Sequence, residues 1–216
     1  MIDIEEVIEK LKAIARKFEK EKGVKVVTSH LPISHTFFDM VTGFICINWE
    51  LVEEGISMFN LEDEKEIIEW FKHSLEHEYL HYRFREALME ELKIYTIEFL
   101  EIIPLEYRIA SEMFAHRNDG MPYYIAKKIS KVAKEDLQYL IIFKIRDVSD
   151  IEKLADFIAI ISTTFTKEEI EELIDELDIE NTKLARVLRQ LNKIKDEFTT
   201  PEKAIELAKT IKKIIE

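Results

Sequence analysis

The sequence contains very little cysteine, glycine and proline. Cys46 is the single cysteine in 216 residues, so the chain forms neither an internal disulfide nor a zinc site built from several cysteines. A reducing compartment is therefore the default expectation. The four glycines and four prolines make up about 4% of the chain, against about 12% in average proteins. This scarcity argues against a turn-rich β-sandwich or barrel.

Excess basic charge and long hydrophobic runs are also missing. The 44 acidic residues outnumber the 31 lysines and arginines, and no basic stripe is present, so nucleic acid is not an expected partner. The longest apolar runs are far shorter than the roughly 20 residues of a membrane span. The first residues have no basic or apolar stretch typical of a signal peptide. We therefore expect a cytoplasmic protein that binds no membrane, and the scarcity of glutamine favours a heat-adapted source.

The spacing of apolar residues predicts an α+β protein that is mostly helical. Apolar positions from Ile4 to Phe18 repeat every 3.6 residues, with Asp3 as the N-terminal cap and Gly23 as the end of this helix. Residues 24–28 and 36–48 have the pattern of two or three short strands, which we expect to form one small antiparallel sheet. From residue 49 onward the pattern is almost wholly helical. We expect the sheet to pack on the long helix predicted near residues 61–92.

Other helix boundaries are marked by glycine, proline and capping residues. We predict helices at residues 49–54, stopped by Gly55, and at 105–116, with further helix starts at Thr166 and Thr200. The weakest boundary lies near residues 147–150. We therefore divide the chain into a domain at residues 1–148 and a helical C-terminal appendage at 149–216, in which we identify no chemistry.

The most informative segment is His77-Glu78-x-x-His81, which lies inside the predicted long helix. Residues four apart lie on one face of a helix, so two imidazoles at this spacing can bind one zinc ion. Glu78 projects beside the ion and can take a proton from zinc-bound water, whose pKa the metal lowers to about 7. In a chain of this composition we expect the pattern by chance roughly 0.03 times.

A third ligand is needed, and the next convincing helix supplies candidates. Glu112 can approach the same ion, Ala115 allows the two helices to approach closely, and His116 lies on the same face as Glu112. His116 can bind a ligand histidine or serve as a ligand itself. Glu106 and Glu101 are the alternatives to Glu112.

The chain resembles the zincin metallopeptidases of the gluzincin type, in particular the small minigluzincin-like proteins. The segment 45–51 is similar to their edge strand and its exit, and Glu112-x-x-Ala115 is similar to their Glu-x-x-Ala-Asp motif, with His116 in the place of the usual aspartate. The resemblance covers about residues 24–120. It implies a zinc site of His77, His81 and Glu112, with Glu78 as the catalytic residue and a peptide or protein substrate.

A second register of the motif is present. His73-Ser74-Leu75-Glu76-His77 follows the inverted pattern H-x-x-E-H and shares His77. We favour His77 and His81 because a strand lies upstream and Glu112 is within short reach. The simplest alternative to both registers is a charged helix that carries three solvated histidines.

We therefore expect a zinc-dependent metallopeptidase that hydrolyses peptide bonds through a metal-bound water. In that scheme Glu78 is the general base and then the proton donor to the leaving amine. An extended substrate is expected to pair with the strand near residues 44–47. The alternative is a catalytically silent zincin-like metal-binding protein, or a helical interaction protein without metal. Oligomeric state and cleavage specificity are not readable from the sequence.

Overall fold

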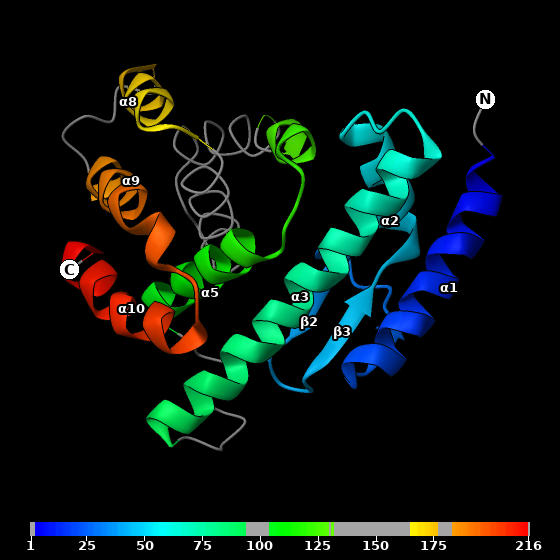
Figure 1. The fold of residues 1–216 in the computed structure, drawn as a ribbon, viewed down its shortest axis with the longest axis horizontal. Coiled ribbons are helices and arrows are strands. Elements are labelled where there is room, and N and C mark those ends of the chain that lie inside the picture. The colour runs from blue at the N-terminus through cyan, green and yellow to red at the C-terminus, as the bar shows by residue number, and fades with distance from the viewer. Residues whose placement is uncertain (1–2, 94–103, 130, 132–164, 177–182, 216) are drawn as a thin grey trace.

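The computed structural model describes residues 3–93, 104–129, 131, 165–176 and 183–215. Within these ranges the chain is mostly helical with one small sheet, which confirms the predicted α+β class (Figure 1). Residues 123–129 also form a helical segment. The elements are α1 (Ile4–Lys22), β1 (Val26–Thr28), β2 (Thr36–Asp39), β3 (Phe44–Ile47), α2 (Trp49–Met58), α3 (Glu64–Leu92), α5 (Leu105–Asn118), α8 (Lys167–Glu176), α9 (Lys183–Ile194), the 3₁₀ turn η1 (Lys195–Glu197) and α10 (Pro201–Ile215).

The sheet has the strand order β1-β3-β2 and is mixed, so the expectation of an antiparallel sheet is wrong for one pair. β2 and β3 form an antiparallel hairpin, whereas β1 runs parallel to β3. The chain between β1 and β2 carries β2 to the far side of β3, which leaves β1 beside β3 in the same direction. β3 is consequently the central strand, and the expectation that residues 44–47 form a free edge for a substrate is also wrong.

The first helix follows its sequence signals closely. The Asp3 carboxylate accepts the Glu6 backbone N–H at 3.2 Å, and Gly23 ends α1 with a positive φ of 68°. The predicted capping box at Thr166 is present too, because the Thr166 and Glu169 side chains bind each other's backbone N–H groups. These ends are local in sequence, which is why they could be predicted.

Gly55 does not stop a helix, as the sequence suggested, but lies inside α2, which continues to Met58. A Cβ atom at Gly55 would lie 3.1 Å from the indole ring of Trp70. The glycine therefore allows α2 and α3 to pack closely. Its role is steric, and the sequence pattern alone does not distinguish this from a helix end.

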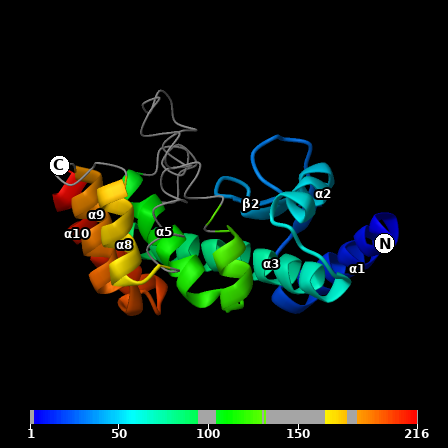
Figure 2. The ribbon, with the colours of Figure 1, turned by 90° about the horizontal axis from the view of Figure 1, so that it is seen from above.

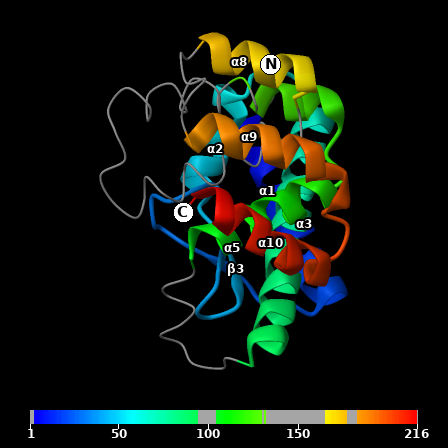
Figure 3. The same ribbon diagram turned by 90° about the vertical axis from the view of Figure 1, so that its left-hand side faces the viewer.

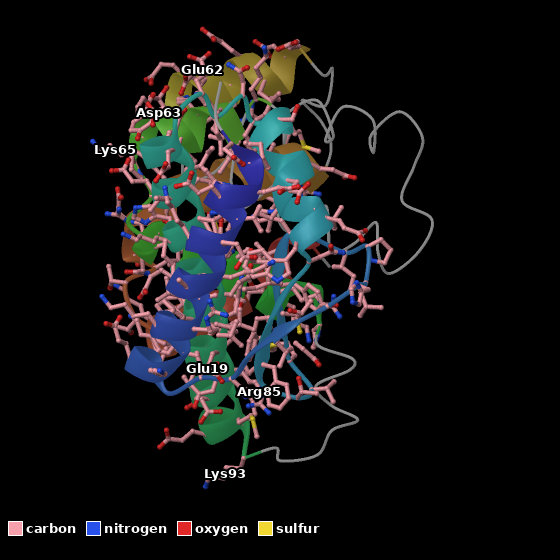
Figure 4. The ribbon with its side chains drawn as sticks, turned by 90° about the vertical axis from the view of Figure 1, so that its right-hand side faces the viewer. Glu19, Glu62, Asp63, Lys65, Arg85 and Lys93 are labelled. Carbon is pink, nitrogen blue, oxygen red and sulfur yellow. The ribbon has the colours of Figure 1, made fainter. Side chains whose placement is uncertain are left out.

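The long helix α3 crosses the whole molecule between two hydrophobic cores (Figures 1 and 2). The sheet-side core joins α1, the sheet, α2 and the first part of α3, where its buried members are Ile67, Trp70, Phe71 and Leu75. The helix-side core joins Phe84 and Leu88 of α3 to α5, α8, α9 and α10. Figure 4 shows α3 from Asp63, near its beginning, to Lys93 beyond its other end.

The C-terminal helices pack directly on the middle of the molecule. α10 contacts both α5 and α3, and α8 and α9 pack against each other beside it (Figure 3). Pro201 opens α10, as expected, and the Thr200 hydroxyl accepts the Lys203 N–H. The predicted boundary near residue 148 lies outside the described residues. In the described part of the chain, no helix has the length and hydropathy that crossing a membrane requires.

Candidate metal centre

Three side chains from α3 and α5 bring their donor atoms together. His77 Nε2 and His81 Nε2 lie 3.0 Å apart. Glu112 faces both rings, with Oε2 at 3.3 Å from His77 Nε2 and Oε1 at 3.2 Å from His81 Nε2. All three side chains are largely buried, with exposed fractions of 10–17%. The structure thus joins the two histidines and the glutamate that the sequence pointed to.

The dimensions of this triangle suit a single small ion. Ligand atoms at about 2.0–2.1 Å from a zinc ion, in a tetrahedron, lie about 3.3–3.4 Å from one another. The two imidazole nitrogens are 3.0 Å apart, and they lie 3.3 and 3.2 Å from the two different oxygens of the Glu112 carboxylate, all close to that value. Two imidazoles and one carboxylate are also a donor set that zinc commonly takes. The residues present therefore fit a zinc ion.

His116 lies against the same cluster. His77, Glu112 and His116 each place one ligand atom within 4.8 Å of the others, so this group could hold a metal ion. His116 Nε2 is 4.0 Å from Glu112 Oε2, and the rings of His77 and His116 are 4.3 Å apart at their centroids. The cluster thus offers three imidazoles around one carboxylate.

Asp119, which sequence analysis did not select, supports this cluster from the turn after α5. Its side chain is only 2% exposed, and Oδ2 accepts a hydrogen bond from His77 Nδ1 at 3.3 Å. The other oxygen, Oδ1, accepts the Met121 backbone N–H at 2.8 Å. A carboxylate on Nδ1 leaves the Nε2 atom of His77 as the donor to a metal.

Ser111 and Thr36 hold two further residues of the motif. The Ser111 hydroxyl lies 2.7 Å from His81 Nδ1, which leaves His81 Nε2 facing Glu112. Thr36, on β2, donates its hydroxyl to Glu78 Oε1 at 3.0 Å. Glu78 is buried on α3 and raises the pKa of the neighbouring His77. Neither Ser111 nor Thr36 was selected from the sequence, because they lie 30 and 42 positions away from His81 and Glu78.

The inverted register is arranged differently. His73 Nδ1 donates a 2.8 Å hydrogen bond to the backbone carbonyl of Asp119, so this ring supports the turn after α5. Glu76 forms a 2.8 Å ion pair with Lys22 of α1. His73 and Glu76 thus contact the Asp119 carbonyl and Lys22, whereas His77 and His81 both contact Glu112. The geometry favours His77 and His81 over His73 and His77.

The structure describes only some of the alternative third ligands. Glu106 lies in the first turn of α5, six residues before Glu112, about 120° around the helix at 3.6 residues per turn. Glu101 lies outside the described residues. Ala115 is fully buried on α5, as close helix packing requires. Glu112 and His116 both contact His77.

Burial and neighbouring charges shift the pKa values of the residues in this cluster. Burial alone would lower the pKa of His77, but hydrogen bonds with Asp119 and Glu112 outweigh it and raise that pKa well above its usual value. Burial would raise the pKa of Glu112, but the nearby charge of His81 and the hydrogen bonds from the histidines keep it well below its usual range. Burial and the charge of His77 lower the pKa of His116. Because a metal ion binds the neutral imidazole, the raised pKa of His77 makes metal binding compete with protonation.

The cluster has to be interpreted from its own geometry. No protein-family model matches the chain, and neither a curated protein nor a solved structure has significant similarity to it.

Proposed function

We propose that the chain is a zinc-dependent metallopeptidase. The observation that supports this most is the triangle of His77 Nε2, His81 Nε2 and a Glu112 carboxylate, whose separations of 3.0–3.3 Å suit one zinc ion. Glu78 lies on the same turn of α3 as the two histidines but turns to Thr36 instead of joining the triangle. Two imidazoles, one carboxylate and a separate buried carboxylate are the set that metal-assisted hydrolysis requires.

His77, His81 and Glu112 would hold the ion, and Asp119 and Ser111 would orient the two rings by binding their Nδ1 atoms. When bound, zinc polarises a carbonyl group and makes water a stronger acid at neutral pH. In this assignment a side chain of the protein has to carry the proton. It also implies a peptide or protein as the substrate.

Glu78 is the proton carrier in this proposal. Its Oε1 atom accepts the Thr36 hydroxyl, so Oε2 is the oxygen that takes a proton from the attacking water and then gives it to the leaving amine. Glu78 is not one of the ligands in this proposal, which leaves its carboxylate available as a base. Because Thr36 is on β2, the strand that borders the sheet also positions the base.

The unpaired edge of β2 is a suitable place for an extended substrate. In the described part of the chain β2 pairs with β3 alone, so its outer edge can accept a peptide strand by main-chain hydrogen bonds. This replaces the original expectation that the strand at residues 44–47 carries the substrate. A peptide on this edge lies beside Thr36 and hence near Glu78.

The test is Glu78→Gln, with Glu76→Gln as the matched control on the same helix. We expect Glu78→Gln to keep its zinc and to lose about 10²–10⁴-fold of its activity on casein or a labelled peptide. Glu76→Gln removes only the ion pair with Lys22 and should stay within a factor of two or so of wild type. A chelator should abolish activity in all active forms. Full activity of Glu78→Gln would refute the mechanism, and an equal loss in Glu76→Gln would support the inverted register.

A second candidate function is a metal-binding protein without peptidase activity. The observation that favours it is the third imidazole, because four protein ligands are typical of structural zinc sites, whereas catalytic sites keep one position open. Zinc bound in a one-to-one ratio together with no hydrolysis of any peptide, in wild type and in all variants, would support this alternative.

A further inference from the structure

His77 and His116 occupy matching positions between the same two carboxylates. Asp119 Oδ2 lies 3.3 Å from His77 Nδ1 and 3.7 Å from His116 Nδ1. On the opposite side, Glu112 Oε2 lies 3.3 Å from His77 Nε2 and 4.0 Å from His116 Nε2. The arrangement that prepares His77 as a ligand through Nε2 is therefore repeated, slightly expanded, around His116.

The backbone explains why His116 has this position. Glu112 and His116 are four residues apart on α5, so their side chains leave the same face of the helix. The His116 side chain is only 15% exposed, and its ring is tilted by 50° against that of His77. The ring consequently lies within the cluster rather than in solvent.

We propose that His116 is a fourth protein ligand of the ion assigned to His77, His81 and Glu112, and that it closes the resting metal centre. The inference rests on the proposed function, because it concerns the same ion. The 4.0 Å between His116 Nε2 and Glu112 Oε2 exceeds the separation expected between two zinc ligands by about 0.7 Å. Ligation by His116 therefore requires its side chain to move closer by that amount.

The consequence is a latent enzyme. With four protein donors the ion has no free position, as in structural sites, and a substrate carbonyl gains access only when His116 withdraws. When His116 withdraws from the ion it stays beside Asp119, because its Nδ1 atom already faces Asp119 Oδ2 at 3.7 Å. His116 thus determines whether the centre is closed or open, while the other three ligands hold the ion.

The experiment compares the full-length wild-type chain with His116→Ala and His116→Phe, each loaded with cobalt(II) in place of zinc. Phenylalanine fills the space of the imidazole without offering a donor, so it serves if the alanine variant folds poorly. His73→Ala is the matched control, because His73 also contacts Asp119 but through the backbone carbonyl. Visible absorption of the cobalt ion reports its ligands, and added azide reports an open position.

We expect azide to leave the wild-type and His73→Ala spectra unchanged and to alter the spectra of both His116 variants. X-ray absorption of the zinc forms should show one imidazole fewer in the His116 variants than in wild type. Peptidase activity of the His116 variants should rise by about tenfold or more. An azide response and an imidazole number that are the same in wild type and in the His116 variants would overturn the inference while leaving the peptidase proposal intact. Failure of the wild-type chain to bind zinc or cobalt would overturn both.

Discussion

The two hydrophobic cores on either side of the candidate site pack against different parts of α3. The buried apolar residues that α3 gives to the sheet-side core end at Leu75, whereas those that it gives to the helix-side core begin at Phe84. His77, Glu78 and His81 lie in the interval between them. Within that interval Tyr79 and Tyr82 pack, partly buried, against the sheet-side core and Leu80 packs against the helix-side core, so the helix changes its packing partner there. The candidate metal centre lies in the same interval.

The segment that runs from α5 to Ile125 also changes from one core to the other. Met113 and Phe114 of α5 belong to the helix-side core, while Ile125 belongs to the sheet-side core. The chain passes from one core to the other at Asp119 and Gly120, where Gly120 has a positive φ of 71°. The carboxylate that binds His77 is thus part of the crossing between the cores. This turn therefore both connects the two cores and places a carboxylate beside His77.

The largest expected effect tests whether the two cores are separate units. Phe71 and Phe84 are both fully buried, one in each core, and replacing either with alanine should lower the free energy of unfolding by about 3–5 kcal/mol. Hydrogen exchange should accelerate in α1 after Phe71→Ala and in α10 after Phe84→Ala. Phe44→Ala is the control, because Phe44 is 37% exposed on β3. Uniform acceleration in both variants would mean that α3 joins the cores into one cooperative unit.

The next effect separates ligands from supporting residues at the boundary. His81→Ala should weaken zinc binding by more than about 100-fold, because a direct ligand is lost, and Glu112→Ala should resemble it. His73→Ala should weaken binding far less, since His73 binds the Asp119 carbonyl. Glu106→Ala should resemble wild type. Competition with a chromogenic chelator measures all four, and a larger loss at His73 than at His81 would move the site to the inverted motif.

Acid should destabilise the sheet side through His35. Burial, with the positive charge of His77, lowers the pKa of His35 to about 4. The unfolded chain therefore binds a proton that the folded chain does not, and stability falls as the pH drops from about 6.5 to 4, by up to about 3 kcal/mol. His35→Phe keeps an aromatic ring against Trp70, 4.7 Å away, and removes the proton. Denaturant unfolding at several pH values should show a smaller loss in this variant, and an unchanged pH dependence would contradict the assignment.

The smallest effect concerns the residues that orient the rings. Asp119→Asn and Ser111→Ala should each weaken zinc binding by about 10–100-fold. Asp39→Asn is a matched control, because Asp39 also accepts the backbone N–H two residues later, at 2.9 Å, but is the last residue of β2. Calorimetric titration with zinc measures the affinities. Equal losses in Asp119→Asn and Asp39→Asn would show that the turn, and not the histidine contact, matters.

Local signals in the sequence were enough for the ends of α1 and for the shared face of His77 and His81. Asp3, Gly23 and Thr166 act on atoms within four residues, so their roles follow from position alone. The i,i+4 spacing of the two histidines likewise determines that their rings meet. Glu112 came from a resemblance rather than from such a rule.

Contacts between distant residues were not readable in this way. Asp119 has the sequence features of a helix end, and only the fold brings its carboxylate to His77, 42 positions earlier. Thr36 belongs to a strand whose register decides that it meets Glu78. The prediction for Gly55 was wrong because the sequence does not distinguish a glycine that packs against a tryptophan ring from one that ends a helix. The parallel pairing of β1 depends on the strand order, which no local pattern contains.

The pairing of His35 with Trp70 gives the protein its own optical signal. Trp70 is fully buried, and in the described residues its indole N–H has no hydrogen-bond partner, so its fluorescence emission should be blue-shifted. The ring of His35 lies 4.7 Å from the Trp70 ring. A protonated imidazole at this distance quenches tryptophan emission, whereas a neutral one does so weakly. Trp49 is partly exposed on α2, so light emitted at short wavelength comes mainly from Trp70 and follows the charge on His35 in the intact, unlabelled chain.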